Sequence, residues 1–186
     1  MLCQICKKNP AVIFMNKLEG GKTTRLALCL ACAHKQGMQL KELFSQSGMT
    51  DEQAEAINKQ IADMMQDLKA AGYQLVVLSN KDDPDVASVL NHYFDEPPFT
   101  VMRGHLPGVP LKPDPAAALN IAKELGIAPA DFWYLGDTPT DLATCRGAGM
   151  NFIAVAWGFR SRQELSEAGA ERIVDTPAQA LEYMLK

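Results

Sequence analysis

The sequence predicts an α/β protein in which a parallel sheet with helices on both faces follows a small cysteine-rich module. From residue 73 onward, short apolar segments of strand character alternate with segments of helical periodicity, the pattern typical of a parallel sheet. Four of the five cysteines lie within the first 32 residues. Residues 1–40 carry six basic and one acidic side chain, a net of +5, so residues 41–186 must sum to −9 within a total of −4. This break in composition indicates two units.

Composition narrows the class of protein further. At 186 residues, with 47% hydrophobic and 22% charged side chains, the chain is neither largely disordered nor collagen-like nor a coiled-coil rod. No run approaches the roughly 18 consecutive apolar residues that a membrane span needs. The first six residues lack the basic-then-apolar pattern of a signal peptide. We therefore expect a cytoplasmic protein without membrane contact.

The first unit has the signals of a hairpin between two cysteine pairs. Residues 11–16 and 23–28 have strand composition, and the Gly20-Gly21 pair between them indicates a turn. A weakly helical connector follows at residues 34–49. Thr50 is then a suitable cap for a helix that runs to Gly72.

The remaining elements alternate. Asp83 is expected to cap the first helix after a strand, with Pro84 at its first position. Strands are expected at residues 73–79, 99–103, 132–136, 151–157 and 172–174, and helices after Asp83, from Asp114, and at residues 142–148, 163–168 and 177–185. We divide the chain into a zinc-binding module (1–33), a helical connector (34–65) and an α/β domain (66–186).

Two C-x-x-C pairs predict a metal site in the module. A two-residue gap lets both thiolates of a pair reach one ion, and a hairpin brings two pairs together, which is the geometry of a structural four-thiolate zinc site. Redox dithiols or disulfides are the alternative, disfavoured by a cytoplasmic setting and by the lack of a thioredoxin-like βαβ context. About 33 residues form too small a core to fold alone, so the metal would supply most of the stability. The expected ligands are Cys3, Cys6, Cys29 and Cys32.

A second constellation lies at the predicted strand ends. Asp137 and Asp141 follow one strand four residues apart, and two carboxylates there suit Mg²⁺. Ser79 and Asn80 end another strand, where a hydroxyl and backbone N–H groups could bind phosphate. Lys112 precedes a helix N-terminus, which favours anions. Each feature alone is also typical of turns, caps or solvated side chains, but their joint occurrence in this order is more specific.

Residues 66–186 resemble the C-terminal half of the haloacid dehalogenase (HAD) superfamily, nearest its phosphoglycolate phosphatase-like branch. The resemblance implies a HAD-like fold and Mg²⁺-dependent hydrolysis of a phosphorylated small molecule. It further implies that Ser79, with Asn80, binds the transferring phosphoryl group and that Lys112 neutralises phosphate and nucleophile. Asp137 would hold Mg²⁺, with Asp141 in support. The matching motifs are Leu78-Ser79-Asn80-Lys81, Lys112-Pro113-Asp114-Pro115, Gly136-Asp137-Thr138-x-x-Asp141 and Val155-Ala156-Trp157-Gly158.

Residues 1–33 resemble the zinc-binding N-terminus of the activators of protein-arginine kinase (McsA). That resemblance implies a module for protein–protein contact and metal sensing. Nucleic acid is disfavoured as a partner, because Phe14 is the sole aromatic residue among the basic first 40 positions. The matching motifs are Met1-Leu2-Cys3-Gln4, Cys6-Lys7, Pro10-Ala11 and Leu28-Cys29-x-x-Cys32-Ala33.

One part of the HAD pattern is missing. The family's reaction needs an aspartate nucleophile in an Asp-x-Asp motif at the end of a first strand, and no Asp-x-Asp lies upstream of Ser79. That strand would lie between the strands that end at Ser79 and near Asp137. The two strands could pair directly, or the gap could be filled by another chain, as in a homo-oligomer, or by residues 11–16.

Three functional hypotheses remain open. The chain is a phosphatase-like protein whose activity by itself is doubtful, or a zinc-dependent adaptor with a catalytically inactive HAD scaffold, or a recombined product of two unrelated pieces.

Overall fold

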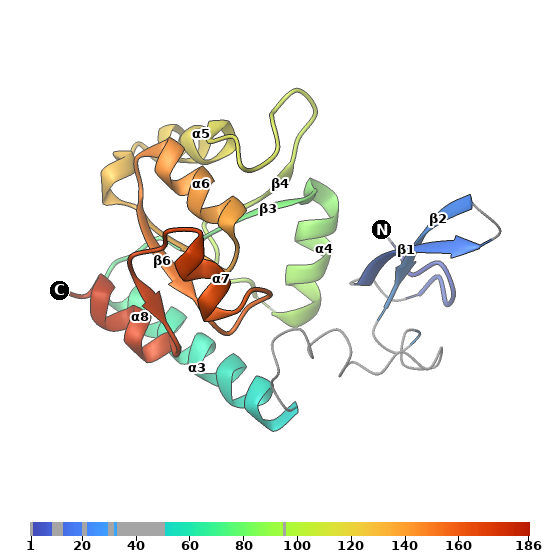
Figure 1. The fold of residues 1–186 in the computed structure, drawn as a ribbon, viewed down its shortest axis with the longest axis horizontal. Helices are drawn as coiled ribbons and strands as arrows, with labels where there is room; N and C mark the ends of the chain where they lie inside the picture. Colours follow the sequence, from blue (N-terminus) through green and yellow to red (C-terminus); the bar gives the residue numbers. More distant parts are fainter. Residues whose placement is uncertain (1, 9–12, 20–21, 30–31, 33–50, 95) are drawn as a thin grey trace.

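The computed structural model describes residues 2–8, 13–19, 22–29, 32, 51–94 and 96–186. Two parts are visible in Figure 1: a hairpin near the N-terminus and an α/β domain. The predicted connector at residues 34–49 and the Thr50 cap lie outside the described residues. The predicted division into module, connector and domain therefore stays a prediction.

The N-terminal hairpin confirms two predicted strands. Strand β1 (Ile13–Glu19) pairs antiparallel with β2 (Lys22–Leu28), from Ile13 opposite Leu28 to Glu19 opposite Lys22. Because residues 13–16 belong to this hairpin, they do not fill a gap in the parallel sheet. Residues 11 and 12 lie outside the described residues.

The α/β domain alternates helices and strands as predicted. It opens with α3 (Asp51–Ala70), a 20-residue helix. None of the helices that the structure describes combines the length and the apolar character that a bilayer span requires. The other elements are β3 (Val76–Asp82), α4 (Asp83–Tyr93), β4 (Val101–His105), α5 (Ala116–Leu125), η1 (Pro129–Asp131), β5 (Trp133–Gly136), α6 (Pro139–Ala148), β6 (Asn151–Val155), α7 (Arg162–Glu167), β7 (Ile173–Val174) and α8 (Pro177–Met184).

Helices cover both faces of the sheet around β6, with α5 and α6 on one side and α3 and α8 on the other (Figure 1). The residues of β6 alternate between the two faces, as a strand requires. Ile153 and Val155 pack in a core with side chains of α3 and α8, whereas Phe152 and Ala154 pack against α6 and α7. This confirms the predicted fold class.

The parallel strands form two separate sheets within the described residues. Strand β3 pairs with β4, and β5, β6 and β7 form a second sheet in that order, with all pairs parallel. Strands β3 and β5 share no ladder, which contradicts the alternative in which they pair directly. Each of them therefore presents one edge that no described strand covers.

The predicted N-cap of the helix after β3 is wrong by one residue, because a contact with a distant strand engages the predicted residue. Helix α4 has Asp82, not Asp83, at its N-cap, and Pro84 still lies at its start. The Asp83 carboxylate instead accepts a hydrogen bond from the Gly104 backbone N–H at 2.8 Å. A Cβ at Gly104 would lie 2.4 Å from the Asp83 Cα, so only glycine allows this approach of β4. Strand β3 also begins three residues later than predicted and continues to Asp82.

Candidate functional site

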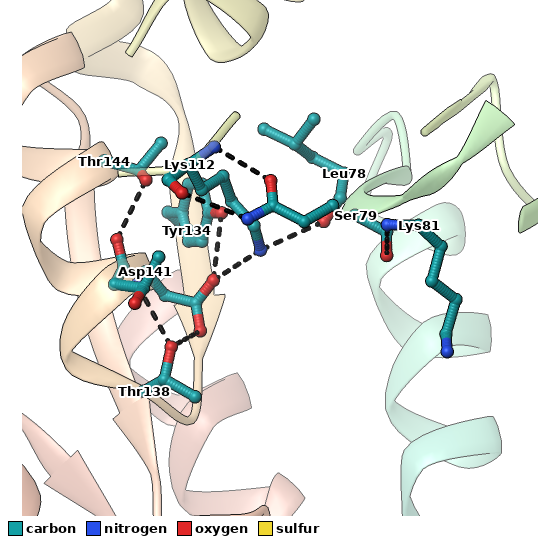
Figure 2. A network of polar contacts seen from close by, with 10 residues as sticks. Leu78, Ser79, Lys81, Lys112, Tyr134, Thr138, Asp141 and Thr144 are labelled. Atoms are coloured by element: carbon teal, nitrogen blue, oxygen red, sulfur yellow. Dashed lines mark hydrogen bonds and ion pairs between the residues drawn. The ribbon is translucent and has the colours of Figure 1, made fainter. Parts of the chain in front are cut away.

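Two of the predicted site residues, Lys112 and Asp141, meet at the carboxyl ends of the strands. Lys112 lies between Leu78 of β3 and Asp141 of α6 (Figure 2). Its Nζ donates to Asp141 Oδ1 at 2.6 Å and to the Leu78 carbonyl oxygen at 3.4 Å. The Lys112 side chain is 14% exposed and that of Asp141 is 8% exposed, so the ion pair is largely removed from water. Such a pair interacts far more strongly than one at the surface.

The N-terminus of α6 fixes the Asp141 carboxylate. Thr138 is the N-cap and accepts a hydrogen bond from the Asp141 backbone N–H at 3.2 Å, while its hydroxyl donates to Asp141 Oδ2 at 2.6 Å. Tyr134 of β5 donates its hydroxyl to Asp141 Oδ1 at 3.3 Å. Burial alone would raise the pKa of Asp141, but the Lys112 ammonium and the Thr138 hydroxyl lower it below its ordinary value. Asp141 is therefore ionised at neutral pH.

The pKa of Tyr134 is shifted in the opposite direction from that of Asp141. Burial, and then the negative charge of Asp141, raise the pKa of the Tyr134 phenol. The phenol stays protonated and acts as a hydrogen-bond donor to the carboxylate.

We expect Asp141→Asn to lower the free energy of unfolding at pH 7 by about 3 kcal/mol, because it leaves the Lys112 ammonium buried without its counter-charge. Since the folded-state pKa of Asp141 is depressed, its contribution is present above the ordinary value of 3.8 and is lost as pH falls through the lower folded-state value. Urea denaturation at pH 7 and at a series of pH values below 3.8 should show that the difference in unfolding free energy between variant and wild type is largest at pH 7 and shrinks as the pH falls.

A surface ion pair provides the matched control. Arg162 Nη1 lies 2.9 Å from Asp175 Oδ1, and both side chains are more than half exposed. Asp175→Asn should cost less than about 1 kcal/mol. Equal effects of the two substitutions would contradict a special role for the buried pair.

Asp137, at the end of β5, is held by a different segment. Its Oδ2 accepts a hydrogen bond from the Phe159 backbone N–H at 2.7 Å. A Cβ at Gly158 would lie 2.2 Å from the Asp137 side chain, so the chain after β6 approaches this carboxylate too closely for any other residue. The segment that follows β6 thus determines where the Asp137 carboxylate points.

The two aspartates differ as ligands for Mg²⁺. Asp137 offers a carboxylate at the strand end, a ligand that suits this hard cation. Both oxygens of Asp141 accept hydrogen bonds, from Lys112 and Tyr134 on one and from Thr138 on the other. Lys112 also supplies a positive charge there. The Asp137 carboxylate therefore fits Mg²⁺ better than that of Asp141, and Mg²⁺ binding by either residue stays a prediction.

Ser79 and Asn80 lie within β3, directly after Leu78, and have different partners. The Ser79 hydroxyl oxygen accepts a hydrogen bond from the Lys81 backbone N–H at 3.2 Å (Figure 2). Asn80, predicted to bind phosphate, has its side-chain amide hydrogen-bonded to the main chain of Lys112.

Sequence reasoning overlooked Thr138 and Tyr134. The Thr138-Pro139 pair is an N-cap signature that could have identified Thr138. Nothing in the local sequence marks Tyr134, because its contact with Asp141 depends on how β5 and α6 pack.

A cavity of about 630 Å³ extends beside this cluster, between the open edges of β3 and β5. Its walls are mostly apolar, with α3 contributing Ile61, Met64, Met65 and Leu68, and α5 contributing Ala118 and Ile121. Its lining includes Tyr73 and Asp131, which precede the two strands, and Asp137 and Lys112 of the candidate site. The cavity is therefore lined by all four residues of β5 but, within β3, only by Val76 and Leu78.

The four N-terminal cysteines form a separate cluster. The four sulfur atoms all lie within 4.8 Å of one another, and none of the four cysteines forms a disulfide. Burial alone would raise the pKa of Cys3, but hydrogen bonds from the backbone of Cys29, Cys6 and Ile5 lower it to about 6. Four converging sulfurs with backbone donors around them form a site that can hold a metal ion.

The parallel strands with helices on both faces make the chain an α/β protein, a class whose ligands usually bind at the carboxyl ends of the strands. Residues 31–155, 125 of the 186 positions, match the model of the haloacid dehalogenase-like hydrolase family. The chain belongs to this family.

Curated relatives and solved structures agree with this assignment. The chain is 28% identical over 119 residues to a phosphoglycolate phosphatase of Psychrobacter arcticus, covering 64% of this chain and 52% of that protein. It is 29% identical over 128 residues to the enzyme of the same name from Escherichia coli K12, covering 68% and 51%. The crystal structure of a candidate phosphoglycolate phosphatase from Lactobacillus delbrueckii subsp. bulgaricus has a TM-score of 0.63 and 36% identity, covering 67% and 52%. The chain thus spans about half the length of the curated relatives it matches.

Proposed function

We propose that this chain forms the phosphate-binding half of a Mg²⁺-dependent phosphomonoesterase, completed by a β-strand from another chain. The observation that carries the proposal is the position of the cavity. It ends at Lys112 and Asp137, so a strand lying in it would deliver its last residues to the predicted site.

The walls of the cavity favour a strand over a small molecule. An inserted strand would satisfy backbone groups along the free edges of both β3 and β5. Its side chains would point alternately toward α3 and α5, and both of these walls are apolar. A strand buried on both faces is a continuous apolar run, as in the interior of parallel sheets.

The direction of the strand follows from its neighbours. Lys112 contacts both the Leu78 carbonyl, where the regular pairing of β3 with β4 is interrupted, and Asp141 just after β5, so the two strands reach the site at the same edge. A parallel strand between them would end there too. A carboxylate at its end would lie beside Lys112, which balances negative charge on a nucleophile and a phosphoryl group.

In the proposed reaction, that carboxylate attacks phosphorus, the bond from phosphorus to the ester oxygen breaks, and the alcohol leaves with a proton from the second Asp of the donated Asp-x-Asp. Water later hydrolyses the acyl phosphate and releases inorganic phosphate. Ser79 would hold a phosphoryl oxygen, and Lys112 would stabilise the charge on the transferring group. Mg²⁺, bound through Asp137, would supply further charge neutralisation. The names of the relatives support a small phosphomonoester such as phosphoglycolate as the substrate.

The test uses two synthetic peptides with about five apolar residues, enough to span the edge of β5, followed by Asp-x-Asp or Asn-x-Asn. With Mg²⁺, we expect hydrolysis of p-nitrophenyl phosphate or phosphoglycolate to be at least about a hundredfold faster with the Asp-x-Asp peptide. Lys112→Ala should abolish the difference. Equal rates with both peptides, or turnover that survives Asp137→Ala, would contradict the proposal.

The donor of the strand is open to a direct test as well. A second copy of this chain would give a homo-oligomer whose dissociation opens the cavity, which sedimentation over a range of protein concentrations would detect. If the protein is monomeric at all concentrations, a second copy is not the donor, and a different polypeptide must supply the strand.

We further propose that the module at residues 1–33 binds Zn²⁺ through its four cysteines and that the protein is cytoplasmic. The resemblance to the McsA module and the convergence of four cysteine sulfurs that form no disulfide support zinc. A reducing compartment would keep these thiols available for the metal.

An adaptor function is the second candidate, favoured by exposed apolar side chains on the module. Leu2 is 55% exposed and Ile5 is 47% exposed, and both lie beside the first cysteine pair. Such side chains suit a protein contact. If the module serves this role, the Leu2→Ser/Ile5→Ser variant should lose protein partners that wild type retains in a pull-down, while Asp141→Asn keeps them. Identical partner sets would count against the adaptor function.

A further inference from the structure

The side chain of Asn80 forms two hydrogen bonds with the main chain of Lys112, which lies 32 positions further along the sequence. Its Oδ1 accepts a hydrogen bond from the Lys112 backbone N–H at 2.8 Å, and its Nδ2 donates to the Lys112 carbonyl oxygen at 3.0 Å. The amide thereby imitates one rung of a β-ladder, because it pairs with both backbone groups of the same residue. This connects the end of β3 directly to the residue that carries the ammonium group.

The ammonium itself depends on this connection. Lys112 follows the long loop after β4 and is followed by Pro113, so neither neighbour belongs to a regular element. Its Nζ reaches Leu78 and Asp141, and the Leu78 contact comes from the same strand end that carries Asn80. A shift of the Lys112 main chain would therefore move Nζ away from both partners.

We propose that Asn80 is a positioning residue that orients the Lys112 ammonium, and that it does not itself bind phosphate. The part of the proposal that concerns phosphate rests on the proposed function. The positioning of Lys112 can be tested without it.

The first experiment measures the reactivity of Lys112 toward acetic anhydride, with each lysine followed by mass spectrometry. In wild type, Lys112 should react slowly because its side chain is 14% exposed and its Nζ is bound to Asp141. Asn80→Ala removes two hydrogen bonds and should raise the rate at Lys112 about tenfold. Lys123, in the last turn of α5, is the internal reference and should not change.

The Asn80→Asp variant is the control for a general effect of substitutions at this position on folding. It keeps an oxygen acceptor for the Lys112 N–H but replaces the donor with a carboxylate that faces the Lys112 carbonyl. We expect a rate at Lys112 between those of wild type and Asn80→Ala, at an unchanged melting temperature. An unchanged rate at Lys112 in both variants would overturn the positioning role.

The second experiment is a double-mutant cycle on the binding of inorganic phosphate in the presence of Mg²⁺. If Asn80 acts through Lys112, Asn80→Ala should weaken binding in wild type but have no further effect in Lys112→Ala. Additive losses would show that Asn80 contacts phosphate directly and would overturn the proposal. Absence of phosphate binding by wild type would instead contradict the proposed function, and the acylation rates would still decide the positioning role.

Discussion

Replacing Cys29 with serine should release the metal from the N-terminal module and unfold it. Structural zinc contributes about 10–16 kcal/mol of binding free energy in small domains, which exceeds the stability that so short a segment could gain from its own core. The Cys29 side chain is buried within the four-sulfur cluster, so an isosteric hydroxyl would leave an incomplete ligand set. We expect the amide signals of residues 2–32 to lose dispersion in NMR spectra.

Elemental analysis gives the metal content directly. Wild type should carry one zinc ion per chain, and Cys29→Ser much less than one. Cys145→Ser is the matched control, because Cys145 is buried in the α/β domain and its thiol donates to the Met150 carbonyl at 3.2 Å, a contact that a hydroxyl can keep. The α/β domain should melt at the same temperature in Cys29→Ser and wild type. Stoichiometric zinc in Cys29→Ser would contradict the four-cysteine site.

The second large effect is expected from filling the cavity between β3 and β5. A peptide that binds only the folded chain stabilises it by about 2.7 kcal/mol at a hundred times its dissociation constant. For a domain of this size, that corresponds to a rise in melting temperature of about 5–10 °C. The Asn-x-Asn peptide should produce this shift without any catalysis, which separates strand binding from the chemistry.

Met65 provides the variant that tests where the peptide binds. Its side chain lines the cavity from α3 and is only partly buried, so Met65→Lys adds charge to the apolar wall at little cost to the fold. We expect this variant to bind the Asn-x-Asn peptide at least about tenfold more weakly, because the inserted strand would bury the new charge. Equal stabilisation of wild type and Met65→Lys would place the peptide elsewhere.

Much of the fold follows from local sequence signals. The alternation of apolar strands with amphipathic helices predicts the parallel sheet, and the side chains of β6 alternate between its two cores accordingly. Boundaries were less predictable where a distant contact decides them. Asp83 has the sequence signature of a helix N-cap. Its carboxylate instead accepts a hydrogen bond from the Gly104 backbone N–H of β4, and Asp82 is the N-cap of α4.

In the candidate site too, some features follow from local sequence and others depend on contacts between distant segments. The rule that ligands bind at the carboxyl ends of parallel strands correctly brings Lys112 and Asp141 together with the end of β3. The local sequence could not reveal that Asn80 pairs with the main chain of Lys112, since this contact depends on how the loop after β4 returns to β3. The predicted gap next to Ser79 corresponds to the cavity, whose apolar walls only the packing of α3 and α5 could define.

The central claim is that the cavity between β3 and β5 receives a β-strand, and hydrogen–deuterium exchange tests it most directly. Backbone amides on the free edges of β3 and β5 should exchange rapidly in the chain alone. The Asn-x-Asn peptide should slow exchange in segments 76–78 and 133–136, while segments in α7 and β7 stay unchanged, because a strand pairs with both edges at once. Protection of both edges by the peptide is the predicted result. Peptide binding that leaves both segments exchanging as before would contradict the account.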